Sequence, residues 1–105
     1  ITDDIIVASG DNPKCYNNVV ISKAADTMLA MAGIEATFVV ARTSDSTVNI
    51  SARSHKTINV QRIMEKMGGG GHFNLAACQL RDCSVAQAKN KLIETIMGEL
   101  APKED

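Results

Sequence analysis

Four consecutive glycines and a histidine, Gly68 to His72, are the residues of this sequence best suited to contact a ligand. A helix needs one glycine to end, which accounts for Gly68 and leaves Gly69, Gly70 and Gly71 without a structural reason. Residues without a Cβ atom let the backbone approach a ligand and turn N–H groups toward phosphate oxygens or a base edge. His72 adds a hydrogen-bond donor. Because no Gly-Lys-Ser/Thr follows, we predict a ligand-binding loop other than a P-loop.

A second group of candidate residues lies on a predicted strand in which Val48, Ile50 and Ala52 alternate with Asn49, Ser51 and Arg53. Alternation places the two sets on opposite faces of the strand. An Arg side chain is a rigid fork of donors that suits a phosphate or a carboxylate, and Ser51 and Ser54 add short donors beside it. We therefore predict an anion-binding role for Arg53, Ser51 and Ser54. The alternative is a plain solvated sheet face.

Several kinds of catalysis lack their residues in this chain. The acidic residues are scattered and the histidines are only His55 and His72, so a two-metal cluster cannot be assembled. Cys15, Cys78 and Cys83 contain no C-x-x-C pair and lack the spacing of a zinc site, so we interpret them as reduced thiols. We expect no catalytic residue, no metal and no cofactor bound by this chain.

Length and composition favour one domain that does not bind long nucleic acid. The chain has 105 residues, of which 45% are hydrophobic, and its formal net charge is −1. Such a length is typical of a single domain with one core, whereas neutralising many phosphates requires a basic surface. No apolar run reaches the roughly 18 residues of a membrane span. The chain begins at Ile1 without an initiator Met, so we expect a piece of a larger protein.

Hydrophobic periodicity predicts four strands and three helices. The expected elements, in chain order, are a strand at 5–8, a helix over about 18–32 ended by Gly33, strands at 34–40 and 48–53 joined by a polar turn, a helix between Asn59 and the glycine run, a strand at 76–80, and a helix that starts with the capping box Ser84–Gln87. The order β-α-β-β-α-β-α predicts an α/β fold with a mixed sheet packed by about three helices, because strict β-α alternation is lacking.

The residues around the glycine run also carry a family resemblance. Gly68 to His72 followed by Ala76-Ala77, and preceded by the stretches 50–54 and 60–67, resembles the C-terminal DHH-associated domain, subfamily one, of the DHH phosphoesterases. The stretch 21–27 and the Ser51-Ala-Arg-Ser54 strand are most similar to the membrane-anchored cyclic-di-AMP phosphodiesterases of Gram-positive bacteria. The likeness covers nearly the whole chain as one domain, 1–105, most securely over 19–86.

The resemblance implies a nucleotide-binding role beside a catalytic domain. In that family an upstream DHH domain, with an Asp-His-His motif, binds two Mn²⁺ that activate water, and this chain has no such triplet. The glycines Gly68 to Gly71 and His72 would contact the nucleotide, and Arg53, supported by Ser51 and Ser54, would hold its phosphate. Expected partners are cyclic di-AMP or the linear dinucleotide pApA, the DHH domain of the same parent chain, and a second copy in a homodimer. The expected location is a cytoplasmic domain of a parent protein anchored in the bacterial membrane.

Two other functions stay open at this point. DHH exonucleases and oligoribonucleases share the glycine–histidine run, so the domain could bind single strands or short RNA. Only three aromatic residues (Tyr16, Phe38 and Phe73) and a net charge of −1 disfavour long strands, which need a basic groove with stacking platforms. A plain interaction domain with a flexible glycine loop is the third alternative.

Overall fold

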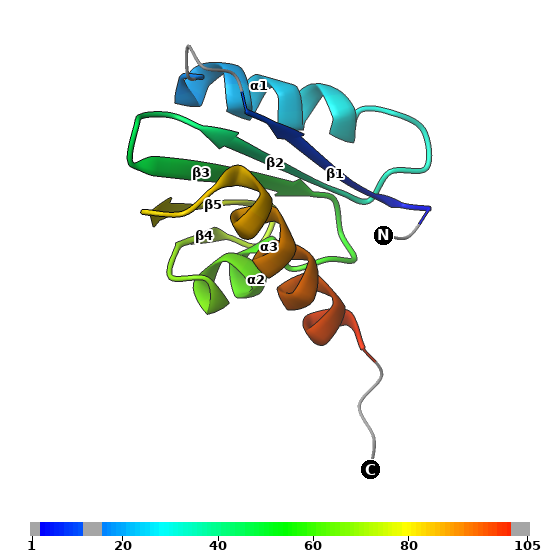
Figure 1. Cartoon of the computed structure of the whole chain (residues 1–105). Coiled ribbons are helices and arrows are strands. Elements are labelled where there is room, and N and C mark those ends of the chain that lie inside the picture. Colours follow the sequence, from blue (N-terminus) through cyan, green and yellow to red (C-terminus); the bar gives the residue numbers. More distant parts are fainter. Residues whose placement is uncertain (1–2, 12–15, 102–105) are drawn as a thin grey trace.

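The computed structural model describes residues 3–11 and 16–101, which form a five-stranded mixed sheet with helices on both faces (Figure 1). The elements are β1 (Ile5–Gly10), α1 (Asn18–Leu29), β2 (Ala36–Arg42), β3 (Thr47–Ser54), α2 (Val60–Lys66), β4 (Gly70–His72), β5 (Leu75–Arg81) and α3 (Val85–Leu100). The strand order is β1-β2-β3-β5-β4, with β1 parallel to β2 and the other pairs antiparallel. The predicted fold class is confirmed, and the structure adds the short strand β4 to the predicted order.

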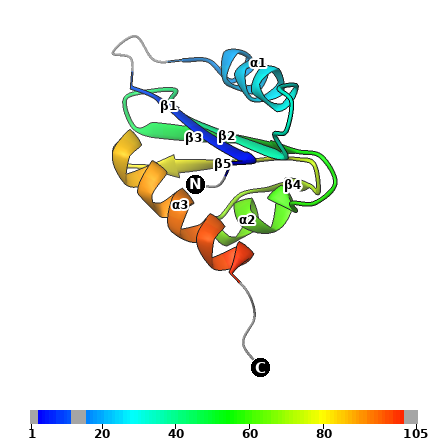
Figure 2. The same ribbon diagram turned by 90° about the vertical axis from the view of Figure 1, so that its right-hand side faces the viewer.

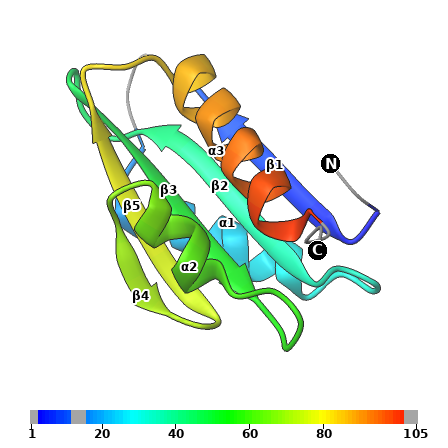
Figure 3. The ribbon, with the colours of Figure 1, turned by 90° about the horizontal axis from the view of Figure 1, so that it is seen from below.

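The sheet separates two apolar layers of unequal size. Helix α1 lies alone on one face, and α2 and α3 lie on the other (Figures 1 and 2). Val48, Ile50 and Ala52 of β3 are fully buried in the larger layer, as their alternation predicts. Figure 3 shows α2 and α3 in front of the sheet, where Arg62 and Lys66 of α2 form ion pairs with Glu99 of α3 (2.8 and 2.5 Å). Among the described residues, no helix is long and apolar enough to cross a membrane.

Side-chain caps fix where each helix begins. Asn17 accepts a hydrogen bond from the Val20 N–H (2.9 Å) and Asn59 accepts one from the Arg62 N–H (3.2 Å), so each supplies a partner for an N–H group that the helix leaves unpaired. The capping box of α3 is also present: the Gln87 N–H donates to Ser84 Oγ (3.0 Å), and the Ser84 N–H donates to Gln87 Oε1 (2.8 Å).

The end of α1 differs from the prediction. The helix stops at Leu29 with Ala30 as its C-cap, three residues before the expected end at Ala32. A tighter turn follows, in which the Ile34 N–H donates to the Met31 carbonyl (3.2 Å). Gly33 takes a positive φ of 83° inside this turn, a conformation that glycine adopts without strain. Gly33 therefore shapes the connection to β2, and β2 begins two residues later than predicted.

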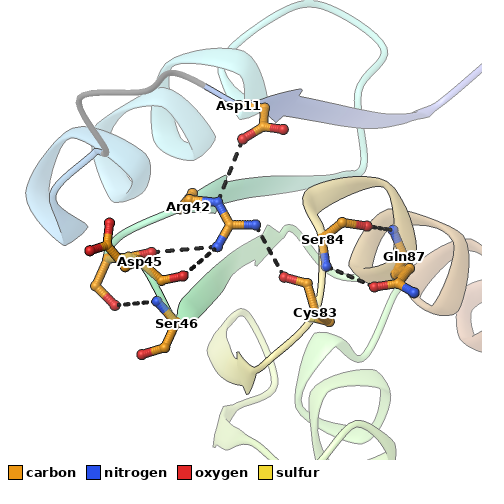
Figure 4. A network of polar contacts seen from close by, with 8 residues as sticks. Asp11, Arg42, Asp45, Ser46, Cys83, Ser84 and Gln87 are labelled. Carbon is orange, nitrogen blue, oxygen red and sulfur yellow. Dashed lines mark hydrogen bonds and ion pairs between the residues drawn. The ribbon is translucent and has the colours of Figure 1, made fainter.

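One arginine joins three chain segments at the end of β2 (Figure 4). Arg42 Nε lies 3.6 Å from Asp11 Oδ1, its Nη1 donates to the carbonyls of Ser44 and Asp45 (3.5 and 3.4 Å), and its Nη2 donates to the Cys83 carbonyl (3.1 Å). The guanidinium thus holds the end of β1, the β2–β3 turn and the start of α3 together at one end of the sheet.

The glycine run is an ordered edge strand and its approach. Gly68, with φ of 90°, follows α2, and the Gly69 N–H donates to the Met64 carbonyl (2.8 Å). Gly70, Gly71 and His72 then pair with β5. A Cβ atom at Gly69 would overlap the backbone of β5 at Ala77 and Cys78, and one at Gly71, where φ is 145°, would overlap β5 at Leu75 and Ala76. A Cβ atom at Gly70 would meet nothing within 4 Å. The close approach of β5 therefore explains why residues 69 and 71 are glycines, a structural reason that the sequence analysis did not identify.

This difference predicts unequal effects of alanine on stability. Gly69→Ala and Gly71→Ala should each lower the free energy of unfolding by about 1–3 kcal/mol, because the added atom forces the β4–β5 pair apart. Gly70→Ala should change it by no more than about 0.5 kcal/mol, because the site has room. Urea unfolding of the three variants measures this, and equal losses at all three positions would contradict it.

Candidate functional site

The sheet register brings most of the predicted site residues to one face. Residues directly opposite each other in an antiparallel pair point to the same side of the sheet. Two neighbouring rows across the sheet on the α1 side are Thr37–Arg53–Leu75–His72 and Val39–Ser51–Ala77–Gly70. Arg53, Ser51, Gly70 and His72, which come from three strands, therefore share a face. The predicted projection of Asn49, Ser51 and Arg53 from one side of β3 is confirmed.

Helix α1 covers only part of this face. It packs on β2 and β3, and the α1 side of β5 and β4 carries no helix (Figure 2). Leu75 is 52% exposed, and Ala77, Gln79 and His72 are also exposed. We call this uncovered surface, formed by Leu75, Ala77, Gln79, Gly70 and His72, the open strip. It is the part of the sheet that a ligand can reach beside α1.

Three polar pairs join α1 to β3 along the border of the open strip. They are Asn49 Nδ2 to Asn18 Oδ1 (2.8 Å), Ser51 Oγ with Ser22 Oγ (3.5 Å), and Arg53 Nε to Asp26 Oδ1 (2.8 Å). The partners on α1 are four residues apart and those on β3 are two residues apart. These two spacings are similar, because four helix residues rise about 6 Å and two strand residues rise about 6.6 Å. We call this arrangement the polar ladder. It sets the position of α1 and lines one side of the open strip with polar groups.

Arg53 is largely buried in the ladder, with only 8% of the residue exposed. Its Nε pairs with Asp26 and its Nη1 donates to the Ala52 carbonyl (2.9 Å). Nη2 makes no hydrogen bond within the described part of the chain, where every buried side-chain polar atom has a partner, so Nη2 reaches the surface. The alternative of a plain solvated face is wrong for Arg53 and Ser51, because α1 covers both. One donor of the guanidinium remains available to an anion.

Ser54 lies away from this group. It follows Arg53 directly and therefore points to the opposite face of the sheet, where it pairs with Ala36 in the register. It is 4% exposed, and its Oγ donates to the Phe73 carbonyl (3.2 Å), while its N–H donates to the Asn74 carbonyl (3.0 Å). These bonds hold the β4–β5 turn against β3. The structure thus places Ser54 under the turn that carries His72 and separates it from Ser51 and Arg53.

Two amide side chains that the sequence analysis passed over lie at the other end of the open strip. Asn18, at the start of α1, and Gln79 of β5 line an open hollow of about 530 Å³ together with Asn49, Gly68, Gly69, Ala77 and Cys78. Gln79 Nε2 donates to Asn49 Oδ1 (3.4 Å). The sequence could have placed Gln79 on this face, since it lies two residues after Ala77 on the same strand. That Asn49 is its partner follows only from the strand register.

Comparison with known proteins places this architecture in a family. The DHHA1 domain matches residues 3–101. The chain belongs to the DHHA1 family. It is 47% identical over 94 residues to the cyclic-di-AMP phosphodiesterase PdeA of Listeria monocytogenes, covering 90% of this chain and 14% of that protein. It is also 47% identical over 92 residues to the cyclic-di-AMP phosphodiesterase GdpP of Geobacillus thermodenitrificans, covering 88% and 14%.

Two further comparisons show more distant similarities. The bifunctional oligoribonuclease and PAP phosphatase NrnA of Thermus thermophilus is 34% identical over 59 residues, which is 56% of this chain and 18% of that protein. In structure, the DHHA1 domain is similar to the C-Ala domain of Aquifex aeolicus alanyl-tRNA synthetase, with a TM-score of 0.68, 17% identity and 88% of each chain covered. That likeness shows the fold. The chain spans 14% of the length of the phosphodiesterases it matches.

The described cysteines of the DHHA1 domain are free thiols without a metal-site arrangement. Cys78 is buried on the α2 and α3 side, and Cys83 is half-buried. Burial raises the pKa of the Cys78 thiol to about 11, an effect that the nearby charge of Lys91 partly opposes. Cys15 lies outside the described residues. Within 3–11 and 16–101, no three His, Cys, Asp or Glu side chains are grouped so that they could hold a metal ion.

The Cys78 environment predicts a slow thiol. The thiolate is the reactive form, and a buried thiol with a raised pKa stays protonated at pH 8. Iodoacetamide at pH 8 should therefore modify Cys83 well before Cys78 in the folded domain, and both at similar rates in urea. Peptide mass spectrometry over time measures the two sites, and equal rates in the folded domain would contradict the assignment.

Proposed function

We propose that this DHHA1 domain binds the nucleotide substrate of a DHH-family phosphodiesterase that hydrolyses cyclic di-AMP to linear pApA. The catalytic groups and two Mn²⁺ would belong to a DHH domain upstream in the parent protein, which we expect to be anchored in the membrane with this domain on the cytoplasmic side. The observation that carries the proposal is the 47% identity to two cyclic-di-AMP phosphodiesterases over about nine tenths of the chain.

The open strip and Arg53 at its border support this proposal, because they offer groups suited to bind phosphate. Arg53 Nη2 and His72 lie in one row with Leu75 between them, so their backbones are about 10 Å apart, two strand spacings. The phosphates of a dinucleotide fit between an arginine donor and an imidazole, because both donate to anionic oxygens. Gly70, beside Ala77 in the next row, keeps the surface low between them.

A domain with this charge distribution favours a ligand with few phosphates. The formal net charge is −1, and the cation of Arg53 already pairs with Asp26. Affinity for long polyanions comes from many cationic contacts and falls steeply with salt. Within the described part of the chain, His72 in the open strip and Arg53 at its border are the two donors proposed for the phosphates, so binding should depend only weakly on salt.

Short oligonucleotides are a second candidate class of substrate. The observation in their favour is the similarity to NrnA, an oligoribonuclease and PAP phosphatase, at 34% identity over 59 residues. Titrating the full-length protein with cyclic di-AMP and with a long single strand, at low and moderate salt, separates the two. Tight, salt-insensitive binding of the dinucleotide supports our proposal, and preference for the long strand with a steep salt slope favours the nuclease.

Substitutions in the open strip and at its border should weaken substrate binding in the full-length enzyme. His72→Ala and Arg53→Lys should each raise KM about tenfold or more, because each removes a hydrogen bond to a charged group worth about 1.5–3 kcal/mol. Arg53→Lys keeps the positive charge but removes the guanidinium, whose separate nitrogens can bind Asp26, the Ala52 carbonyl and a ligand at the same time. Gly70→Val should weaken binding further by covering the surface beside Ala77.

The control for these variants is Lys91→Ala, which removes an exposed cation from α3, on the other side of the sheet, and should leave KM unchanged. A melting curve for each variant separates loss of binding from loss of fold. Wild-type KM for both His72→Ala and Arg53→Lys would show that the ligand binds elsewhere.

The 105-residue chain alone should hydrolyse nothing. Its described residues contain no group of side chains that could hold the two divalent ions which such hydrolysis uses. Incubating the purified chain with Mn²⁺ and cyclic di-AMP, then measuring pApA by chromatography, tests this. Turnover above buffer that a chelator abolishes would contradict it.

A further inference from the structure

The guanidinium of Arg53 is held at two of its three nitrogens. Its Nε donates to Asp26 Oδ1 on α1 (2.8 Å), and its Nη1 donates to the Ala52 carbonyl of its own strand (2.9 Å). A guanidinium is rigid and planar, so fixing two of its nitrogens also fixes the direction of the third. Either contact alone would leave the plane free to turn about that contact. The two contacts together therefore determine where Nη2 points.

The contact to Asp26 contributes little to the docking of α1. The Asp26 side chain is 62% exposed, and an ion pair with an exposed partner adds little to the free energy of unfolding. Other contacts hold the helix: the Thr37 hydroxyl donates to the Ala25 carbonyl (2.8 Å), and His55 Nε2 lies 3.1 Å from the Leu29 carbonyl. The other two pairs of the polar ladder also remain. We therefore expect α1 to stay in place when the carboxylate is removed.

We propose that Asp26 is a positioning residue for the phosphate contact: its carboxylate holds Arg53 so that Nη2 donates to a phosphate in the open strip. The inference rests on the proposed function and adds a residue that acts through Arg53 without touching the ligand. The register sets Leu75 between Arg53 and His72. A phosphate over Leu75 would thus lie between the two donors of the proposed site.

An arginine that is already oriented binds an anion more tightly than a mobile one. A free arginine side chain has many rotamers, and ordering it on binding lowers the affinity. Arg53 is only 8% exposed and is ordered by its contacts within the domain. Without the carboxylate, Nε loses its partner and the ligand itself would have to orient the guanidinium. Substrate affinity should then fall, whereas the chemical step in the proposed DHH domain should be unaffected.

Two variants of the full-length enzyme separate the hydrogen bond of Asp26 from its charge. Asp26→Asn and Asp26→Ala both remove the negative charge, but only Asn keeps a side-chain oxygen that can accept from Arg53 Nε. The KM for cyclic di-AMP should be about fivefold or more higher for Asp26→Ala than for Asp26→Asn, since only the former loses this bond. The kcat values should be similar. Equal KM values would overturn the role of Asp26.

Thr37→Val is the control for helix docking. It removes the hydrogen bond to the Ala25 carbonyl, and Thr37 is fully buried, so it cannot contact a ligand. Its KM should equal that of the wild type. A KM raised as far as in Asp26→Ala would show that any loosening of α1 has this effect, and would overturn the inference. Loss of the folded state of Asp26→Ala at the assay temperature, measured by a melting curve, would overturn it as well.

A double-variant comparison shows whether Asp26 acts through Arg53. Arg53→Met keeps an unbranched apolar side chain but has no donor. In this background Asp26→Ala and Asp26→Asn should have the same KM, because the residue that they position is absent. A persisting difference would overturn the positioning role. Wild-type KM for Arg53→Met itself would overturn the proposed phosphate site, whereas a raised KM there with equal KM for the two single Asp26 variants would overturn this inference alone.

Discussion

The polar ladder between α1 and β3 is the interaction on which the candidate binding face depends. Helix α1 buries only Ile21 and Ala25 completely, so its apolar contact is small for a helix of 12 residues. The three polar pairs fix the orientation of the helix axis. All three can form together only when α1 runs along β3, so that every fourth helix residue meets every second strand residue. A helix fixed over β2 and β3 leaves the same face of β5 and β4 uncovered. The same contacts that dock α1 therefore create the open strip.

Strand alternation divides the glycine run between two tasks. Gly69 and Gly71 need to be glycine because the backbone of β5 occupies the place of their side chains, and Gly70, between them, faces free space on the α1 side. Close packing of β4 on β5 holds the run in a defined position, which disfavours the alternative of a merely flexible loop. A rigid edge strand positions His72 and keeps its own surface low beside Ala77. Alternate residues of one segment thus differ: Gly69 and Gly71 allow β4 to pack on β5, and Gly70 leaves the surface on the α1 side open.

Periodicity and capping residues were sufficient to predict the three helices, the buried side of β3 and the caps Asn59 and Ser84, because those signals are local. The strand β4 was missed because glycines carry no hydrophobic pattern. Grouping Ser54 with Arg53 ignored that neighbouring strand residues point to opposite faces. The grouping of Asn18, Asn49 and Gln79 depends on helix docking and on strand register, which are long-range properties that no local pattern contains. The burial of Arg53 follows from the same docking.

The electrostatics of this face limit how a ligand can be selected. Asp26 balances the charge of Arg53, leaving one guanidinium donor and His72 for an anion. Contacts to phosphate alone carry no information about the base, so a domain with two such groups would accept any small phosphate ester. Discrimination among such esters needs contacts to other parts of the ligand, since a mismatch there leaves a donor or an acceptor unpaired. The neutral amides of Asn18, Asn49 and Gln79 lie at the opposite end of β3 from Arg53 and add no charge to this face.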